Sequence, residues 1–238
     1  MRNKDKWIPT RIKLDKDNNL IPNEKNVKKE TFIPVTLECE VMNKIEKKYL
    51  KGKLLDLGCE KVPYYAWYKD KIDENICLDW IKNDYVDIVH DISKNFPFND
   101  GEFDSILSTF VLEHIYNPYN MLKECYRVLS KGGHLIISSN FSYWEHDFPH
   151  DYLRYSEYFF LRTATELGFE VCELHPLGDG FCSMFDIATK MCTYRPNSIF
   201  FKMLYKILKN FFFYFHVKKK KSMFSKQPLG YICVMRKI

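Results

Sequence analysis

The stretch KLLDLGCEKVPYY, residues 53–65, decides the fold of this chain. An apolar run ends in Asp56, and Gly58 follows where a strand of a nucleotide-binding fold turns sharply into a helix. Such a turn usually carries a second glycine two positions later, but Glu60 stands there. The loop therefore lacks the G-x-G-x-x-G pattern of dinucleotide-binding turns, and the chain has no G-x-x-x-x-G-K-[ST] phosphate loop.

Residues 53–176 alternate short apolar or β-branched runs with helical patterns, which predicts a parallel α/β sheet. The strand candidates, including one near the end of the chain, lie at 53–57, 75–79, 86–90, 103–109, 134–139, 169–174 and 231–235. The helix candidates lie at 34–50, 117–133 and 156–168. Two of the crossover segments are too short or too irregular for a full helix, so we expect short or missing helices there.

Composition describes an ordinary globular chain with an uneven charge distribution. Of the 238 residues, 46% are apolar and 28% are charged. Net charge is +6 over residues 1–53, −12 over 54–194 and +11 over 195–238, where no acid occurs. This balance predicts an anionic partner for the last segment. Because the acidic centre opposes a polyanion, we expect no nucleic-acid binding.

The N-terminus and the cysteines predict a cytoplasmic protein. MRNKDKW is charged and lacks the apolar stretch of a signal peptide, so we expect no secretion. The eight cysteines are scattered without a C-x-x-C pair. This spacing favours reduced, buried thiols over disulfides or a zinc site.

Three predicted strands end in, or are followed by, an acid: Asp56, Asp79 and Asp91. The carboxyl ends of parallel strands meet at one edge of the sheet, where such folds bind ligands. An acid about 20 residues after the first strand can accept both hydroxyls of a ribose. The sequence therefore predicts a nucleoside-containing cofactor at this edge, with Asp79 on its ribose.

The motifs LLDLGC, LDW and VHDI, together with FPFNDGEFDSILSTFVLEHIYNPYNMLKECYRVLSKGGHLIIS, resemble a class I S-adenosylmethionine-dependent methyltransferase. The resemblance covers residues 53–176. It implies a Rossmann-like, mainly parallel seven-stranded sheet with an antiparallel last strand, and S-adenosylmethionine as the cofactor. The block YWEHDFPHDYLRYS, residues 143–156, is similar to a branch of this family often associated with bacterial surface-glycan and lipid-linked sugar pathways.

The resemblance also assigns cofactor-binding residues by position. Asp79 takes the ribose hydroxyls, Trp80 lies beside the adenine, and the adenine amine is bound by Asp91 with backbone contact from Ile92. The residues expected at the methionine and sulfonium end are Asp56, Gly58, Cys59, Glu60, Ser108 and Thr109.

Glu60 occupies a glycine position of the family, and Val62 occupies the next one. A side chain there limits backbone approach, and a carboxylate repels the carboxylate of the cofactor. Two alternatives remain open. Either Glu60 pairs with the cofactor's ammonium group, or binding is weak and the protein is a non-catalytic scaffold.

The loop after the fifth predicted strand carries the candidate catalytic residues. Transfer of a methyl group to a hydroxyl requires a base, whereas a carboxylate or phosphate acceptor requires none. His146 or His150 is predicted to act as the base, Asp151 to orient an imidazole, and Arg154 to bind an anionic acceptor. The structural alternative is that Arg154 pairs with Asp151 or Asp147 and shapes the loop. We expect no metal ion.

The basic segment IFFKMLYKILKNFFFYF, residues 199–215, is too short and too rich in lysine to span a bilayer. Its lysines fall on one side of a helix, and Lys218 to Lys221 follow directly. This pattern suits peripheral contact of residues 199–221 with an anionic membrane surface. A lid or a homodimer helix is the alternative.

These observations predict four regions: an N-terminal arm and helix (1–52), a methyltransferase core (53–176), a basic helical insertion (177–228) and the last core strand (229–238). The expected reaction is methyl transfer to a small or lipid-linked acceptor, and the preferred acceptor atom is an oxygen of a glycan or phosphorylated intermediate. A lipid-soluble acceptor such as a quinone is the alternative.

Overall fold

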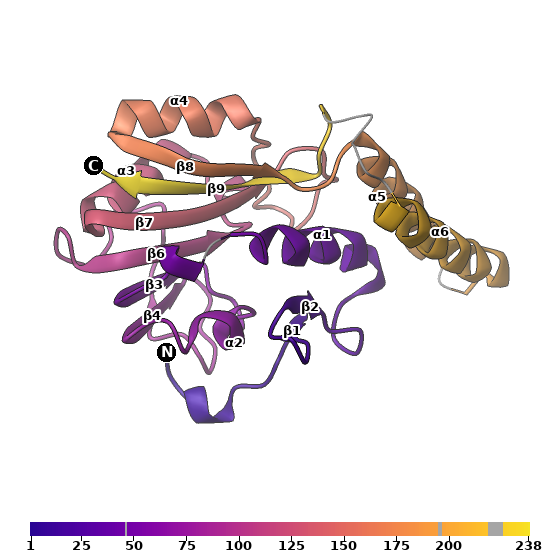
Figure 1. The fold of residues 1–238 in the computed structure, drawn as a ribbon, viewed down its shortest axis with the longest axis horizontal. Helices are drawn as coiled ribbons and strands as arrows, with labels where there is room; N and C mark the ends of the chain where they lie inside the picture. The colour runs from indigo at the N-terminus through magenta and orange to yellow at the C-terminus, as the bar shows by residue number, and fades with distance from the viewer. Residues whose placement is uncertain (46, 195–196, 219–225) are drawn as a thin grey trace.

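The computed structural model describes residues 1–45, 47–194, 197–218 and 226–238. Its centre is a seven-stranded sheet in the order β5-β4-β3-β6-β7-β9-β8 (Figure 1). The sheet strands are β3 (Lys53–Leu57), β4 (Glu74–Asp79), β5 (Ile88–Val89), β6 (Phe103–Thr109), β7 (Leu129–Asn140), β8 (Phe169–Pro176) and β9 (Gly230–Lys237). Neighbouring strands from β5 to β7 are parallel, and β9 is antiparallel to both β7 and β8. The predicted fold class is confirmed.

The helices and the small N-terminal strands surround this sheet (Figure 1). The α-helices are α1 (Phe32–Met42), α2 (Tyr65–Tyr68), α3 (Pro118–Val128), α4 (Glu157–Leu167), α5 (Gly180–Thr193) and α6 (Ile199–Lys218). The 3-10 helices are η1 (Lys4–Lys6), η2 (Lys29–Thr31), η3 (Lys47–Tyr49) and η4 (Leu112–His114). As the sequence predicts, no helix lies between β4 and β5 or between β5 and β6, all of which the structure describes.

The period-2 alternation of β3 divides the core into two layers. Leu54 and Leu55 are both fully buried, but they belong to different hydrophobic clusters. Leu54 packs with residues of α1, α2 and the N-terminal arm, whereas Leu55 packs with residues of α3 and α4. Leu55 pairs with Ile76 of β4 and Ile106 of β6, so the carboxyl ends of three strands lie side by side.

Several predicted boundaries were wrong, and the three largest differences concern the first helix, the junction of α3 with β7, and β5. The first helix ends at Met42 rather than at residue 50, because the side chain of the next residue, Asn43, bonds the backbone of Leu20 in the N-terminal arm. Asn43 Oδ1 accepts from Leu20 N (2.8 Å), and Asn43 Nδ2 donates to Leu20 O (2.9 Å). Helix α3 ends at Val128, and the two glycines predicted to stop it lie inside β7. Strand β5 is limited to two residues.

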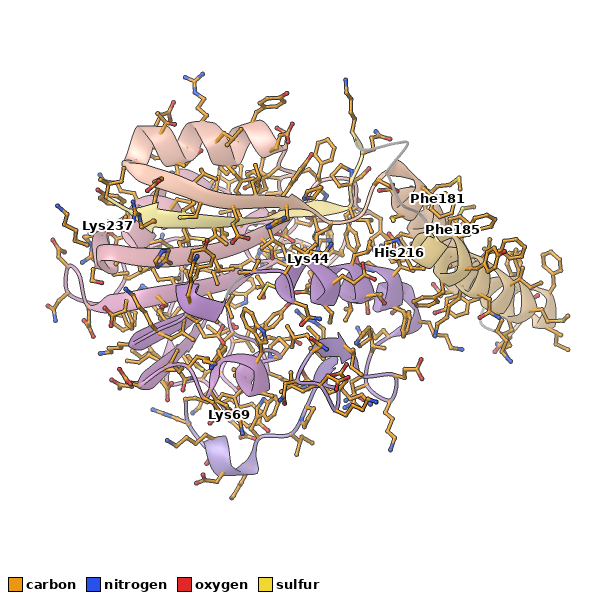
Figure 2. All side chains as sticks on the ribbon, viewed as in Figure 1. Lys44, Lys69, Phe181, Phe185, His216 and Lys237 are labelled. Atoms are coloured by element: carbon orange, nitrogen blue, oxygen red, sulfur yellow. The ribbon has the colours of Figure 1, made fainter. Side chains whose placement is uncertain are left out.

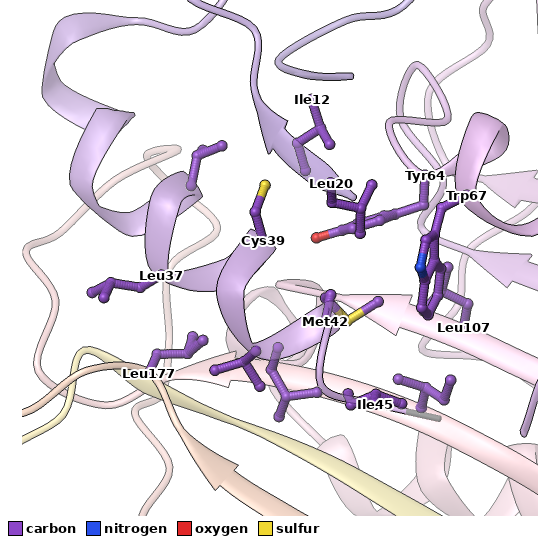
Figure 3. Close-up of a cluster of buried hydrophobic side chains, with 14 of the residues drawn as sticks. Ile12, Leu20, Leu37, Cys39, Met42, Ile45, Tyr64, Trp67, Leu107 and Leu177 are labelled. Carbon is purple, nitrogen blue, oxygen red and sulfur yellow. The ribbon is translucent and has the colours of Figure 1, made fainter. Parts of the chain in front are cut away.

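The N-terminal arm forms a small antiparallel pair, β1 (Ile12–Leu14) with β2 (Leu20–Pro22). Ile12 and Leu20 are 0% and 2% exposed. They lie in the cluster that contains Cys39 and Met42 of α1 and Tyr64 of the loop after β3 (Figure 3). Burial of two aliphatic side chains, each worth about 1.5–3 kcal/mol, anchors the arm on the core.

Helices α5 and α6 form a hairpin at one end of the molecule (Figure 1). The ring of Phe185 packs on Phe212, which is fully buried, and Phe213 packs on Phe32 of α1. His216 joins the hairpin to the body, with Nε2 2.8 Å from Glu40 Oε2 and Nδ1 3.7 Å from Cys182 Sγ (Figure 2). The predicted lysines 219–221 lie outside the described residues.

Candidate functional site

The loop after β3 keeps the backbone geometry of a glycine-rich turn without the glycines. Gly58 has a φ of +71°, and a Cβ there would lie 2.3 Å from Val111 Cγ2. Glu60 and Val62 also have positive φ values, +47° and +52°. Positive φ is uncommon for side-chain-bearing residues and unusual for a β-branched one. The two substituted positions therefore adopt the conformation that glycine would favour.

The N-terminal arm packs directly on this loop. Arg11 Nη1 donates to Glu60 Oε2 at 2.8 Å. The indole N–H of Trp7 lies 3.1 Å from Val62 O, and its ring packs edge-on against Tyr65 at 5.2 Å. The carboxylate of Glu60 is thus paired with a guanidinium, an outcome that neither sequence alternative included.

Asp56 and Asp79 lie at neighbouring strand ends, and both are 6% exposed. Asp56 Oδ2 accepts from the hydroxyl of Tyr68 at 2.8 Å. Burial raises the pKa of Asp56 to about 7, and the nearby charge of Asp79 acts in the same direction. Asp79 Oδ2 accepts from Glu60 N (2.8 Å) and Oδ1 accepts from Ile81 N (2.9 Å). Each oxygen of Asp79 retains a lone pair for a ribose hydroxyl.

The remaining predicted cofactor residues differ in exposure. Asp91 is exposed, and its Oδ1 accepts from Ser93 N and Ser93 Oγ, which lower its pKa. Ile92 and Cys59 are buried. Ser108, near the end of β6, is 1% exposed, and its Oγ has no hydrogen-bond partner among the described residues. Thr109 next to it is partly exposed.

Arg154 and Asp151 shape the loop between β7 and α4. The guanidinium forms a bidentate pair with Asp151, at 2.5 Å to Oδ1 and 2.7 Å to Oδ2. Its other N–H groups donate to the carbonyl oxygens of Tyr143, Trp144 and Leu153. All five donors of Arg154 are therefore in use, so this arrangement offers none to an anionic acceptor.

His146 presents an unprotonated nitrogen. Its Nδ1 lies 3.2 Å from Asp151 Oδ2 and 3.3 Å from Trp144 O, and both are acceptors. Nδ1 therefore carries the proton, and Nε2 carries the lone pair. Burial lowers the pKa of His146, against the opposing effect of Asp151. The imidazole is consequently neutral near pH 7, as a general base must be.

The structure places His114 next to His146, a contact that the sequence does not predict. The two rings meet edge to face at 4.9 Å. His114 Nδ1 lies 2.6 Å from His150 O, so Nδ1 donates and Nε2 faces Asp147 at 3.8 Å. The motif L-E-H directly after a strand was the available signal.

His150 reaches the predicted cofactor edge. Its ring packs edge-on against Trp80 at 4.7 Å, and its Nδ1 lies 3.0 Å from the hydroxyl of Tyr152. Trp80, at the end of β4, is 50% exposed. The loop carrying His146 and His150 therefore meets the strand end that carries the predicted ribose and adenine residues.

Glu113 is the buried anchor of this loop and was also missed. It is fully buried, with Oε2 accepting from Ser139 Oγ (2.8 Å) and Oε1 accepting from Asn140 Nδ2 (2.5 Å). Burial raises the pKa of Glu113 to about 7. Donor atoms of Glu113, His114 and His146 lie within 4.8 Å of one another. Through these two hydrogen bonds the carboxylate of Glu113 ties the segment after β6 to the end of β7.

Residues 55–137 match the sequence family described as a methyltransferase domain. An uncharacterised protein of Methanocaldococcus jannaschii is 32% identical over 108 residues, 42% of this chain and 53% of that protein. The ubiquinone/menaquinone biosynthesis C-methyltransferase of a Ruegeria species is 34% identical over 61 residues, 26% of this chain and 21% of that enzyme. The chain thus spans about half of the first relative and about a fifth of the second.

A solved structure shares the fold over most of the chain. The S-adenosylmethionine-dependent methyltransferase of Mesorhizobium loti superposes with a TM-score of 0.55 at 13% identity, covering 86% of this chain and 100% of that one. The residues at the sheet edge fit the same cofactor: Asp79 has lone pairs left for the ribose, and Ser108 Oγ is buried with no hydrogen-bond partner in the part of the chain that the structure describes. The core of this chain therefore has the fold of S-adenosylmethionine-dependent methyltransferases, residues 55–137 match the methyltransferase-domain family, and S-adenosylmethionine is the cofactor that this match implies.

Proposed function

We propose that the protein transfers a methyl group from S-adenosylmethionine to an oxygen of a small or lipid-linked acceptor, such as a glycan or a phosphorylated intermediate. The observation that carries this proposal is the neutral imidazole of His146 on a loop that contacts Trp80 through His150. The methyltransferase-domain match supports the cofactor half of the reaction. The resemblance of residues 143–156 to the surface-glycan branch supports the acceptor half.

When bound, S-adenosylmethionine supplies an electrophilic methyl group. Asp79 holds the ribose hydroxyls, Trp80 and Ile92 border the adenine, and Asp91 accepts from the adenine amine. His146 Nε2 accepts the proton of the acceptor hydroxyl, while Asp151 holds Nδ1–H and so fixes the tautomer. Arg154 keeps Asp151 in place and acts as a positioning residue.

A quinone is the alternative acceptor, because the aligned Ruegeria relative is a quinone C-methyltransferase by name. Methylation at carbon and at oxygen leave different products, which separates the two candidates. A non-catalytic scaffold is the third candidate, and it predicts no cofactor binding.

We also propose that the α5–α6 hairpin contacts an anionic membrane surface. No helix among the described residues is long and apolar enough to cross a bilayer. The hairpin nevertheless exposes many large apolar side chains: Met184, Ile187, Met191, Tyr194, Ile199, Phe200, Met203, Ile207, Phe211, Tyr214 and Phe215. Lys202 and Lys206 are exposed on the same helix, which suits anionic headgroups. Lys209 is not part of this proposed membrane contact, because its Nζ packs over the ring of Phe32 at 3.6 Å.

Labelled methyl transfer tests the reaction. The protein is incubated with methyl-labelled S-adenosylmethionine and either a lipid extract or a water-soluble extract of cells that express it. Label released as an O-methyl sugar supports the proposal, label in a C-methylated quinone supports the alternative, and no transfer to either extract contradicts both. For a hydroxyl acceptor, His146→Ala should slow transfer by about 10²–10⁴-fold and leave cofactor affinity unchanged.

Vesicle co-sedimentation tests the membrane contact. Each lysine near an anionic surface contributes about 1 kcal/mol, so Lys202→Gln with Lys206→Gln should weaken binding to anionic vesicles roughly thirtyfold. The exposed arm residue Lys13, changed to Gln, is the matched control. If the wild type stays in the supernatant and light scattering shows a dimer, the hairpin is a homodimer surface instead.

A further inference from the structure

The arm and the cofactor loop are joined by one exposed ion pair. Arg11 Nη1 and Glu60 Oε2 lie 2.8 Å apart, although the residues are 49 positions apart in sequence. The side chain of Glu60 is 64% exposed, and that of Arg11 is 28% exposed. Both groups therefore remain open to solvent, at the loop expected to receive the methionine end of the cofactor.

The guanidinium is held in position by buried neighbours. Ile12, the next residue, is fully buried beside Tyr64 (Figure 3). Arg11 Nη2 also lies 3.8 Å from Oε1 of Glu38, a buried carboxylate to which the Tyr64 hydroxyl donates. Arg11 is thus a cation held in place by the anchored arm, and its Nη1 faces the exposed carboxylate of Glu60.

Glu60 is the more accessible acid for the cofactor's ammonium group. Its side chain is 64% exposed, whereas Asp56 is 6% exposed and accepts a hydrogen bond from Tyr68. The amino-acid end of S-adenosylmethionine is a zwitterion, with an ammonium and a carboxylate on the same carbon. A carboxylate and a guanidinium held 2.8 Å apart have the complementary charges.

We propose that the Arg11–Glu60 ion pair is the receptor for the zwitterionic amino-acid end of the cofactor. Arg11 donates to the cofactor's carboxylate, and Glu60 accepts from its ammonium group. Because Arg11 neutralises Glu60, the acid at the glycine position does not repel the cofactor. The inference rests on the proposed use of S-adenosylmethionine, and it favours ammonium pairing over weakened binding.

Two probes isolate this end of the ligand. S-adenosylhomocysteine carries the zwitterion, whereas 5′-methylthioadenosine has the same nucleoside and thioether without it. By calorimetry, Glu60→Gln and Arg11→Lys should each weaken S-adenosylhomocysteine binding roughly tenfold or more, the scale of one charge-assisted hydrogen bond. Neither change should alter 5′-methylthioadenosine affinity by more than about twofold. Lys13→Ala is the matched control, because Lys13 is an exposed cation two residues from Arg11.

The outcomes separate this inference from the proposed function. If the wild type binds neither probe, cofactor use fails and the receptor fails with it. If the wild type binds S-adenosylhomocysteine but both variants match it, or weaken both probes equally, the receptor alone is wrong. The conservative variants are chosen because Arg11→Ala would leave Glu38 buried without its cation, and thermal unfolding confirms that each variant is folded.

Discussion

Replacing Arg154 by alanine distinguishes a loop-shaping residue from an acceptor-binding one. In the wild type its guanidinium makes five hydrogen bonds, two of them to Asp151, whose side chain is 6% exposed. Alanine removes all five and leaves the carboxylate of Asp151 among buried groups without its cation. We therefore expect Arg154→Ala to lower the free energy of unfolding even when no ligand is present.

The magnitude follows from the Asp151–Arg154 pair. Although burial opposes it, hydrogen bonds from Arg154 and from His146 N lower the pKa of Asp151 to about 2. A shift of this size corresponds to about 2 kcal/mol of stability. The lost carbonyl contacts add about 1 kcal/mol after exchange with water, because Arg154 is 23% exposed. The expected loss is thus about 2–4 kcal/mol.

Urea unfolding at several pH values measures this loss. Because the folded-state pKa of Asp151 is depressed, its contribution is present above about pH 4 and is lost as the pH falls through about 2. The gap between wild type and Arg154→Ala should therefore be largest near pH 7 and shrink in acid. Arg162→Ala is the control: this arginine is 83% exposed, pairs with Glu166, and should cost less than about 0.5 kcal/mol. Equal stability of Arg154→Ala and wild type at pH 7 would refute the loop-shaping role and free Arg154 for an anionic acceptor.

Three further changes test the fold around the site. Gly58→Ala should weaken cofactor binding in calorimetry, because the φ of Gly58 is +71° and the new Cβ would collide with Val111. Adding Val111→Ala removes the collision but not the backbone strain, so it should recover only part of the affinity. Lys190→Met should lower the free energy of unfolding by about 3–5 kcal/mol, because it leaves Asp186 buried and unpaired. Adding Asp186→Leu should recover most of this loss. Hydrogen bonds with Cys182 and Glu40 raise the pKa of His216 to about 10. The stabilisation that His216 contributes is therefore complete below pH 6.5 and is lost as the pH rises towards 10. The free energy of unfolding should depend less on pH over this range in His216→Asn.

Local sequence signals predicted the sheet edge well. The acids at 56 and 79 lie in apolar runs that form the paired parallel strands β3 and β4, and the ends of both strands are buried on both faces. Glycine at 168 ends α4 with a φ of +86°, as the helix-stop signal predicts. These features depend on neighbours within a few residues, which is why they could be predicted from one sequence.

Contacts between distant loops could not be predicted in the same way. His114 and His146 lie on different segments, and their edge-to-face contact depends on the buried carboxylate of Glu113 holding the strand end beneath them. The sequence allows Arg154 to bind an acceptor or to shape the loop, and the hydrogen bonds made by all five of its N–H donors favour the second role. No periodicity encodes how the loop between β7 and α4, residues 141–156, folds on itself.

The loop at residues 58–62 shows how such distant contacts can replace a motif. Left-handed backbone at a side-chain-bearing residue costs about 1–3 kcal/mol and persists only where surrounding contacts hold it. Here Glu60 N donates to Asp79, and Trp7 of the arm donates to the carbonyl of Val62, so contacts outside the loop fix both residues. Contacts with the anchored arm thus hold a backbone conformation that glycine would otherwise be needed for, and the same arm brings Arg11 to the loop. The arm and the loop must therefore be treated as one unit: replacing Glu60 by glycine alone would relieve backbone strain but remove the carboxylate that Arg11 now pairs with.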